Sequence, residues 1–263
     1  MYLVDTHTHL TFEPIWSQLG DVLERAGRHD VQRVLAPAYD LESWGRIRKL
    51  LSSSGVYGAF GVHPWKADEA LNPDDLQHAM GLPHAVAIGE IGLDFKVASP
   101  SPEVQTALFR MQLELAISLN KPVMLHCRGA FMEMIDILKS YAGKVRGVVH
   151  AFSRGPDLAE TFVRLGLHIG FGGAITRSNA TRARAAATTV PWERIVLETD
   201  SPSIGVEGVE PEKTEPMHIA LIAAVLAQLR RTDVAHVADV TTRNAELLFG
   251  LPPGSAAVES PKY

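Results

Sequence analysis

Short apolar segments alternate with longer amphipathic segments along almost the whole chain. The apolar segments have the length and bounding turn residues of buried strands, and the amphipathic segments repeat with the helical period of about 3.6 residues. Strands are expected near residues 2–7, 32–37, 56–62, 85–90, 122–127, 146–151, 167–171 and 194–199. Helices are expected near residues 15–27, 41–52, 73–80, 102–119, 129–141, 156–165, 179–188, 215–230 and 233–248.

Eight strand-then-helix units in succession predict parallel strands joined by crossovers, and eight such strands close a barrel. We therefore expect an α/β fold of the (β/α)8 TIM-like type. The length of 263 residues suits one such domain, which often fills about 250 residues. A doubly wound open sheet is the alternative, but the chain lacks the GxGxxG loop typical of it.

The chain shows no sign of division into several domains. It has no internal repeat and no linker rich in Pro, Gly or Ser. Residues 1–251 are therefore expected to form a single barrel domain. The last segment, residues 252–263, is mostly polar and lacks periodicity, which predicts a disordered tail.

Charge and composition narrow the class of protein. The formal net charge of -5 argues against a strong general attraction to nucleic acid, although bound divalent metals would reverse the field inside an acidic site. The only cysteine is Cys127, so the chain cannot form a disulfide within itself, which fits a reducing compartment. We find no signal segment and no apolar run near the ~18–20 residues that span a bilayer. A cytoplasmic protein, monomeric or weakly oligomeric, is expected.

Metal-binding side chains follow five of the predicted strands. In a barrel the carboxyl ends of the strands meet at one mouth, where such enzymes place their chemistry. Imidazole and carboxylate together form a ligand set for Zn²⁺, Mn²⁺ or Fe, and Mg²⁺ is also suited where carboxylates dominate. The sequence therefore predicts a divalent-metal site at the barrel mouth. Its candidate ligands are His7, His9, Glu90, His126, His150 and Asp200.

Residue parity along the strands extends this prediction. The strand period of two places His7 and His9 on one face, aimed into the barrel, so both could reach one metal. Asp5 shares this parity and could orient a ligating ring, or it could simply be a polar strand start. Glu198 is expected to lie deeper than the other carboxylates and to support a ligating histidine. Asp94 lies beyond the predicted strand end, which favours an acid in a surface turn.

Six short motifs occur in order along the chain. They are Asp5-Thr6-His7-Thr8-His9-Leu10, Gly61-Val62-His63-Pro64, Gly89-Glu90-Ile91-Gly92-Leu93-Asp94, Leu125-His126-Cys127-Arg128, His150-Ala151-Phe152-Ser153 and Leu197-Glu198-Thr199-Asp200-Ser201-Pro202. Together with Thr242-Arg243-Asn244-Ala245 near the end, they make the chain resemble the TatD-type metal-dependent deoxyribonucleases. The resemblance covers roughly residues 3–251.

The resemblance implies a distorted barrel, one or two divalent metal ions (Mg²⁺, Mn²⁺ or Zn²⁺) and hydrolysis of phosphodiesters, with DNA as the substrate. Carried over to this chain, one metal would be held by His7, His9, Glu90 and Asp200. The second metal would be held by Glu90, His126 and His150. The substrate phosphate would be contacted by His63 and Arg128.

Three of these residues are assigned catalytic roles. Asp200 would accept the proton of the attacking water if it lies within hydrogen-bond reach. Arg128 would stabilise the charge that builds on the phosphate, although a surface ion pair is the alternative. His63 could donate to the phosphate or to the leaving oxygen, or it could be an ordinary hydrogen-bonded histidine of the barrel mouth.

The chain departs from the family pattern at two positions, which puts the DNA substrate in question more than the hydrolysis. Gly129 stands where the family commonly has an acid, and Glu215 precedes Pro216 where the family often has Asn. The segment of residues 203–215 is also acidic. Stacking and phosphate contacts could be built from loop residues such as Trp65, Lys66, Phe95, Lys96, Phe152, Arg154, Arg177 and Arg182.

Four functions remain open on the sequence. The first is a metal-dependent deoxyribonuclease that removes nucleotides from single-stranded DNA ends in the manner of a 3′–5′ exonuclease. The second is a hydrolase of an amide, ester or lactone, because a metal-activated water serves that reaction equally well. A non-catalytic binding module is the third, but it should lack a ligand, and none is missing. The fourth is a partner subunit in a larger nucleic-acid-processing assembly.

Overall fold

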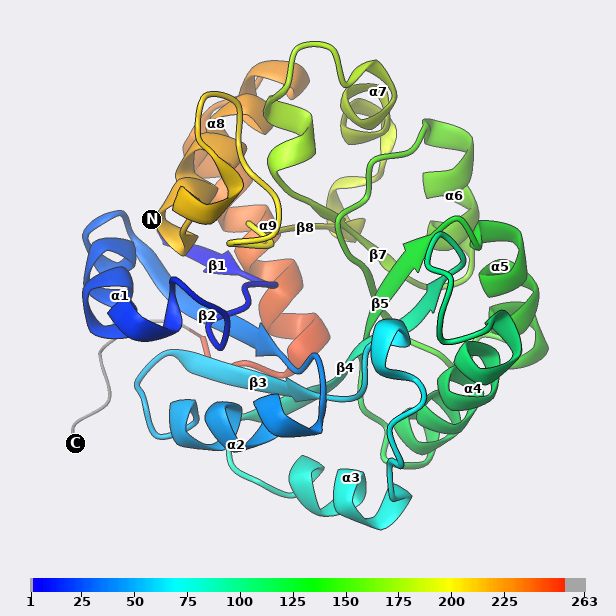
Figure 1. The fold of residues 1–263 in the computed structure, drawn as a ribbon. Coiled ribbons are helices and arrows are strands. Elements are labelled where there is room, and N and C mark those ends of the chain that lie inside the picture. Colours follow the sequence, from blue (N-terminus) through cyan, green and yellow to red (C-terminus); the bar gives the residue numbers. More distant parts are fainter. Residues whose placement is uncertain (1, 254–263) are drawn as a thin grey trace.

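Eight parallel strands form a barrel in the order of the sequence (Figure 1). The structure is a computed structural model that describes residues 2–253. All strands predicted from the sequence are confirmed, and the doubly wound alternative is wrong, because each strand pairs with its neighbour in the chain. The tail predicted at residues 252–263 lies, from residue 254 on, outside the described residues. The strands are β1 (Leu3–Asp5), β2 (Val31–Pro37), β3 (Val56–Phe60), β4 (Ala85–Asp94), β5 (Val123–Arg128), β6 (Gly147–Val149), β7 (His168–Phe171) and β8 (Ile195–Leu197).

Helices surround the sheet (Figure 1), and their buried apolar side chains share one core cluster with side chains of the strands. They are α1 (Leu19–Arg28), α2 (Leu41–Leu50), α3 (Pro73–Met80), α4 (Pro102–Ser118), α5 (Phe131–Ser140), α6 (Pro156–Arg164), α7 (Thr181–Thr189), α8 (Ile219–Arg230) and α9 (Val234–Phe249). The predicted helices are confirmed, but α1 and α8 start later than expected because a short 3-10 turn precedes each. Within residues 2–253, no helix combines the length and the apolar character required to cross a membrane.

The barrel closes through irregular chain that follows β1 and β8. The backbone N–H of Thr6 donates to the carbonyl of Leu197 at 3.0 Å, and the N–H of Asp200 donates to the carbonyl of His7 at 2.8 Å. Asp200 adopts a left-handed backbone conformation with φ of 50°, which is costly outside glycine and is typical of functional sites. Closure of the barrel thus places the segments that carry His7 and Asp200 side by side.

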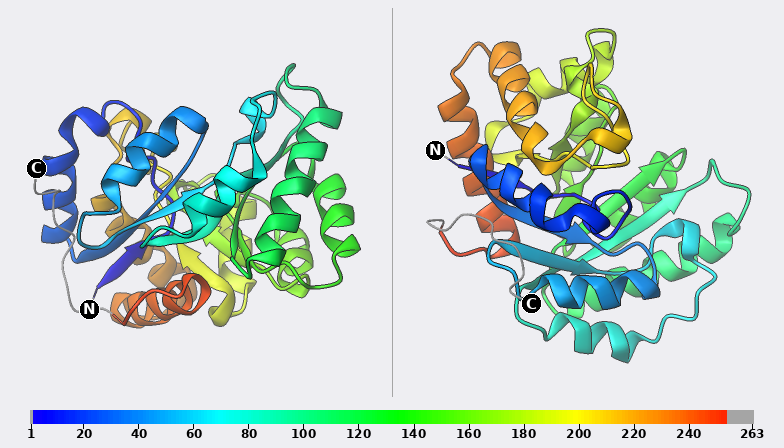
Figure 2. Two further views of the ribbon diagram at one scale, coloured as in Figure 1. Left: turned by 90° about the horizontal axis from the view of Figure 1, so that it is seen from below. Right: turned by 60° about the vertical axis from the view of Figure 1, so that its left-hand side comes forward.

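The barrel interior is filled at one end only. Apolar side chains from the strands pack there against Leu248 and Phe249 of α9, which crosses the end of the barrel near the N-terminus (Figure 2). This packing leaves the opposite end, where the carboxyl ends of the strands lie, as the place for a site. The strand residues of this cluster include Val4, Leu35, Met124, Val148 and Val196.

β4 is longer than predicted, and this corrects the expectation for Asp94. The strand continues past Glu90 and remains paired with β5 as far as Asp94. A Cβ at Gly92, where φ is +147°, would lie 2.0 Å from the carbonyl oxygen of His126, so glycine is required for this close pairing. Asp94 is therefore a fully buried strand residue with the parity of Glu90, and its placement in a surface turn was wrong.

One histidine of the sheet gives a prediction about stability. Burial lowers the pKa of His168, at the start of β7, to about 4, and the charge of Arg194 acts in the same direction. Between that value and the ordinary pKa of about 6.5, the unfolded chain binds a proton that the folded chain does not, so this residue costs stability as the pH falls. We expect the change in unfolding free energy caused by His168→Gln, measured against wild type, to be about 1 kcal/mol more favourable at pH 5 than at pH 7.

Urea denaturation of the metal-free protein in EDTA at both pH values measures this difference. The same substitution at the exposed His78 on α3, His78→Gln, is a control away from the sheet. An identical pH dependence in His168→Gln and wild type would contradict the prediction.

Candidate metal centre

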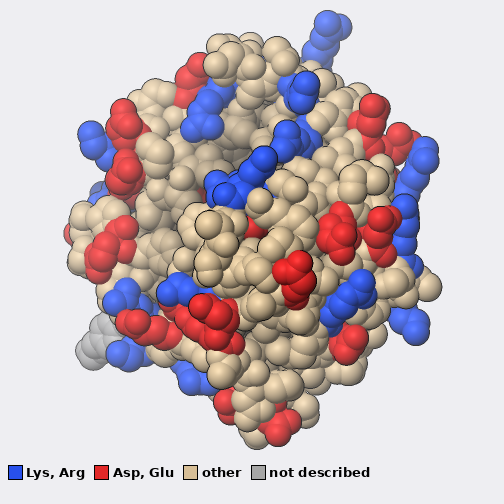
Figure 3. Space-filling model, turned by 45° about the vertical axis from the view of Figure 1, so that its right-hand side comes forward, with Lys and Arg blue, Asp and Glu red and all other residues tan. Residues whose placement is uncertain are grey.

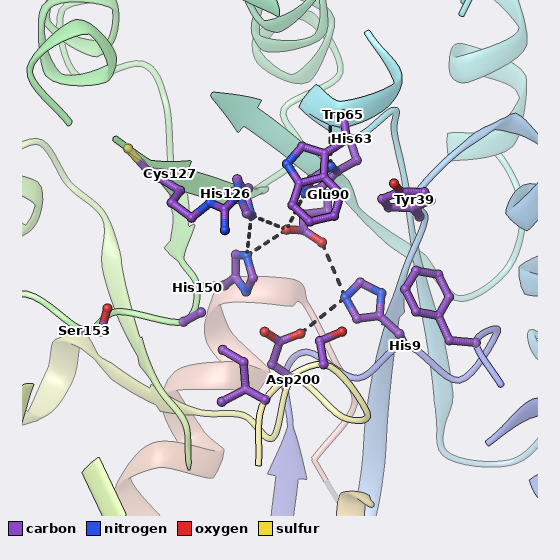
Figure 4. A pocket seen from close by; sticks show the side chains of 15 residues that line it. His9, Tyr39, His63, Trp65, Glu90, His126, Cys127, His150, Ser153 and Asp200 are labelled. Carbon is purple, nitrogen blue, oxygen red and sulfur yellow. Dashed lines mark hydrogen bonds and ion pairs between the residues drawn. The ribbon is translucent and has the colours of Figure 1, made fainter. Parts of the chain in front are cut away.

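The six predicted ligands converge at the mouth of the barrel. They come from the segments after β1 and β6, from β4 and β5, and from the segment after β8. Five of them line one cavity (Figure 4), and His7 lies behind them with Nε2 3.3 Å from Glu90 Oε2. Five of them are buried, whereas His126 is half-buried. The structure thus brings the six side chains together, and their role as metal ligands stays a prediction: His7, His9, Glu90, His126, His150 and Asp200.

The first group of ligand atoms, called cage A here, consists of His7 Nε2, His9 Nε2, Glu90 Oε2 and Asp200 Oδ1. Each imidazole nitrogen lies 3.3–3.8 Å from the carboxylate oxygens, and the two nitrogens are 3.4 Å apart. Ligands about 2.1 Å from a tetrahedral cation lie about 3.4 Å from one another. The spacing of cage A therefore suits a single divalent cation.

The second group, called cage B here, is built around the other oxygen of the same glutamate. Glu90 Oε1 lies 2.7 Å from His150 Nε2 and 2.9 Å from His126 Nδ1, and the two nitrogens are 3.3 Å apart. The two oxygens of Glu90 thus belong to different groups of ligand atoms. A carboxylate in this position can bridge two cations.

The hydrogen-bond partners of the buried carboxylate oxygens show whether a cation fits the cages. The buried atoms Glu90 Oε2 and Asp200 Oδ1 accept no hydrogen bond from any residue within 2–253. Leaving a buried carboxylate oxygen without a partner is costly, and a cation between these oxygens and the facing imidazoles would satisfy them. The donor set, which combines neutral imidazole with carboxylate, is also one that divalent metals bind. The residues present therefore fit a metal.

The charges of the site favour a cation. Burial would raise the pKa of Glu90, but His150, His63 and His7 nearby hold it well below its ordinary value. Burial lowers the pKa of His7 to about 4, which keeps this imidazole neutral, the form that ligates metal. Burial also disfavours the charged form of His150, yet the field of Glu90 raises the pKa of His150. The same field would attract a divalent ion.

Asp94 joins three residues of the cavity and was missed by the sequence prediction. Its Oδ2 accepts hydrogen bonds from Trp65 Nε1 at 2.6 Å and from Arg128 Nε at 2.8 Å, and it lies 3.2 Å from His126 Nε2. Burial opposes ionisation of Asp94, but these partners lower its pKa far below the ordinary value, so it acts as an acceptor. The ionised Asp94 favours a proton on Nε2 of His126, and Nδ1 of the same ring faces Glu90 Oε1 of cage B. The shared parity with Glu90 was the signal that could have identified this residue.

His63 lies beside cage B as a hydrogen-bond donor. Its Nδ1 accepts from the backbone N–H of Trp65 at 3.1 Å, and its Nε2 is 3.4 Å from Glu90 Oε1. Burial lowers the pKa of His63 to about 4, so the ring is neutral and its single proton is on Nε2. This tautomer gives His63 an N–H directed at the cavity and leaves no free lone pair for a metal.

Arg128 lies at the rim of the same cavity, with about half of its side chain exposed. The guanidinium is held through Nε by the buried carboxylate of Asp94 and lies 5.4 Å from the centre of the Trp65 ring. Arg128 thus forms an ion pair, as in the alternative drawn from the sequence, but its partner is the buried Asp94 and the pair lies at the mouth of the site. The structure brings both predicted phosphate-contact residues, His63 and Arg128, to the metal cages.

Two further acids support the site from below. For Asp5 the sequence left open a ring-orienting role or a polar strand start; its carboxylate accepts hydrogen bonds from the backbone N–H and the hydroxyl of Thr199 and from the N–H of His7. It therefore ties β1 to the end of β8. Glu198 accepts from the N–H of Ala151, and its Oε1 lies 3.9 Å from His150 Nδ1, close to a candidate ligand as predicted.

The departures from the family pattern lie away from the cages. Glu215 forms a bidentate ion pair with Arg25 of α1 and does not line the cavity. Gly129 has φ of +74°, and a Cβ there would lie 3.0 Å from Cγ of Lys96. Glycine at this position is thus explained by a tight turn.

Comparisons with known proteins agree with this geometry. A family model described as TatD related DNase matches residues 4–250. YjjV of Escherichia coli K12, described as an uncharacterized metal-dependent hydrolase, is 34% identical over 254 residues, covering 95% of this chain and 98% of that protein. YabD of Bacillus subtilis, with the same description, is 30% identical over 252 residues, covering 94% and 98%. The crystal structure of YjjV superposes with a TM-score of 0.89 over 95% of this chain and 98% of that chain, at 33% identity.

Proposed function

The chain belongs to the family of TatD related DNases and is a metal-dependent hydrolase, and from this premise we propose that it cleaves phosphodiester bonds of DNA. The proposed reaction removes nucleotides from single-stranded ends. The observation that carries the proposal is the position of Glu90, whose two oxygens face separate ligand groups in the cavity that Arg128 also lines. Two adjacent cations suit the transfer of a phosphoryl group between two oxygens.

We assign cage A and cage B as the metal-holding residues. When bound, the ions supply Lewis-acid stabilisation of the phosphoryl oxygens and acidify a water toward a neutral pKa. Glu90 would hold both ions at a fixed separation. Asp94 would keep Nδ1 of His126 free and aimed at cage B, since it takes the proton on Nε2.

Asp200 is the proposed proton acceptor. Burial opposes its charged form, but the neighbouring imidazoles of His9, His150 and His7 lower its pKa, so it is ionised at neutral pH. Its Oδ1 belongs to cage A, whereas Oδ2 can accept a proton from the attacking water.

His63 and Arg128 are the proposed phosphate contacts. The N–H of His63 at Nε2 can donate to a phosphate oxygen without competing for metal. The hydrogen bonds of the Arg128 side chain within residues 2–253 use only Nε, which leaves both Nη groups for an anion. The two donors flank the cavity that contains the cages, so a phosphate at Glu90 could meet both.

The shape of the mouth supports a substrate longer than a small ester or lactone. The cavity above the cages has a volume of about 330 Å³, and a second cavity of about 250 Å³ adjoins it. Ser153, Asp200 and Ser203 line both. A chain could therefore continue from the metal cages across these residues.

Hydrolysis of end-labelled single-stranded DNA with Mg²⁺, Mn²⁺ or Zn²⁺ tests this function, beside a panel of lactones and cyclic amides. We expect cleavage of DNA that EDTA abolishes and that added metal restores. His126→Ala should lose most of this activity while remaining folded, because cage B loses a ligand. His78→Ala, on the exposed face of α3, should retain it. Hydrolysis confined to lactones or amides, or equal rates in His126→Ala and wild type, would contradict the proposal.

A further inference from the structure

Three aromatic side chains from separate loops form one side of the cavity. They are Phe12, Tyr39 and Trp65, which follow β1, β2 and β3 and are called the aromatic wall here. The ring centres of Phe12 and Tyr39 are 5.4 Å apart, those of Tyr39 and Trp65 are 6.4 Å apart, and both pairs meet edge to face. In Figure 4, Tyr39 lies on one side of Glu90 and Ser153 on the other, and Trp65 lies beside His63.

The aromatic wall retains surface that water contacts. Trp65 is 40% exposed, and Phe12 and Tyr39 are half-buried. Exposed aromatic rings beside a polar site are favourable when another flat ring packs on them, because stacking adds to the area removed from water. Phe12 and Tyr39 were not identified from the sequence, whereas Trp65 was among the loop residues proposed for stacking.

A donor for anions lies directly beside this wall. The guanidinium of Arg128 covers Trp65 at 5.4 Å from the ring centre, and its Nη groups make no hydrogen bond to residues 2–253. Figure 3 shows Lys and Arg side chains bordering the hollow on this face of the molecule. A ligand that fits both features carries a flat ring and a phosphate a short distance apart.

The size of the cavity limits what can be held. Its volume of about 330 Å³ is at the small end of ligand sites, which range from about 300 to 1,000 Å³. This is room for one nucleotide unit above the cages. A single-stranded nucleotide can splay its base toward the wall because the base is not paired.

We propose that the aromatic wall is a nucleobase subsite, which stacks the base of the nucleotide adjoining the phosphate held between Arg128 and the metal cages. This inference rests on the proposed function and deepens it, because the wall, and not only the metal, selects nucleotides over other phosphodiesters. Recognition by stacking is tolerant of sequence, since every base offers a flat ring. The subsite therefore predicts preference for the presence of a base without strong preference among bases.

The first test removes the base instead of a residue. Two single-stranded oligonucleotides are compared that differ only at the end from which cleavage proceeds, where one has thymine and the other a tetrahydrofuran abasic unit. For the metal-loaded wild type we expect kcat/KM to fall about tenfold or more without the base. Phe12→Leu and Tyr39→Leu keep an apolar side chain but remove the ring. In these variants the ratio of kcat/KM with the base to kcat/KM without it should fall toward one.

The second test measures binding and not activity. Thymidine 5′-monophosphate should quench the tryptophan fluorescence of the Mg²⁺-loaded protein, and 2-deoxyribose 5-phosphate should not. Trp65→Phe should abolish the quenching. Trp192→Phe is a matched control, because Trp192 also has an arginine over its ring and a histidine edge-on to it but lies outside the cavity. Quenching should persist in that variant.

The two tests separate the subsite from the nuclease function. If neither oligonucleotide is cleaved but thymidine 5′-monophosphate quenches Trp65, the nuclease function fails and the nucleobase subsite stands. If DNA is cleaved at equal rates with and without the base, the subsite is overturned and the nuclease function stands. Quenching that persists in Trp65→Phe, or that the base-free sugar phosphate also produces, likewise overturns the subsite.

Discussion

Replacing Glu90 by glutamine is expected to abolish binding at both metal cages and to reduce hydrolysis by at least about a thousandfold. The physical reason is that one carboxylate contributes Oε2 to cage A and Oε1 to cage B, and both sets of imidazoles depend on its charge. The amide of glutamine keeps the shape but lacks the charge and presents a donor to one cage. Metal content after dialysis, measured by mass spectrometry, should fall from the wild-type value to near zero.

Thermal unfolding gives an independent measure of the same change. A ligand at about 100 times its dissociation constant stabilises the folded state by about 2.7 kcal/mol, which in a chain of this size raises Tm by about 5–10 °C. Added Zn²⁺ or Mn²⁺ should therefore raise the Tm of wild type and leave that of Glu90→Gln unchanged. Glu103→Gln, on the exposed surface of α4, is the control and should respond like wild type. Retention of both ions in Glu90→Gln would contradict the proposed role of Glu90 as a bridge between the two cages.

The second large effect is expected for Asp94→Asn, although Asp94 belongs to neither cage. Its carboxylate fixes the proton of His126 on Nε2, so Nδ1 remains available to cage B. Loss of such a partner typically weakens metal affinity 10–100-fold. We expect a loss of this size at cage B and little change at cage A. Arg128 also loses its anchor, so KM should rise together with the fall in kcat.

A titration that resolves two classes of bound metal measures this effect. A merely structural role for Asp94 would weaken both classes alike or lower the stability of the metal-free protein. The nitrogen chemical shifts of His126 would report the tautomer directly, and they should move from protonated Nε2 toward a mixture in Asp94→Asn. Asp136→Asn, on the exposed face of α5, should change neither. Equal affinity for both metals in Asp94→Asn and wild type would refute the assignment.

The main features of the site follow from local pattern. Apolar runs of strand length, each followed by a helical period, predict the barrel, because both periods are properties of neighbouring residues. His7, His9 and Asp200 could be identified at strand ends by the same reasoning, since the carboxyl ends of parallel strands meet wherever the barrel closes. The set of candidate ligands was thus predictable without knowing a single distance.

Other features depend on contacts between distant segments. Asp94 was misplaced because the length of β4 is decided by pairing with β5, which brings Gly92 against His126. The tautomer of His63 depends on the backbone of Trp65 after both have folded at the barrel mouth. Hydrogen bonds of this kind require positions accurate to a few tenths of an ångström, which sequence periodicity does not contain.

The sequence by itself determined which side chains would meet at the mouth of the barrel, because the strand period and the alternation of strands with helices depend only on neighbouring residues. Only the tertiary structure decided how they meet: the bridging of two cages by Glu90, the burial of Asp94 and the row formed by Phe12, Tyr39 and Trp65. These arrangements arise when three or more loops far apart in sequence are fixed by closure of the barrel, and no single segment encodes them.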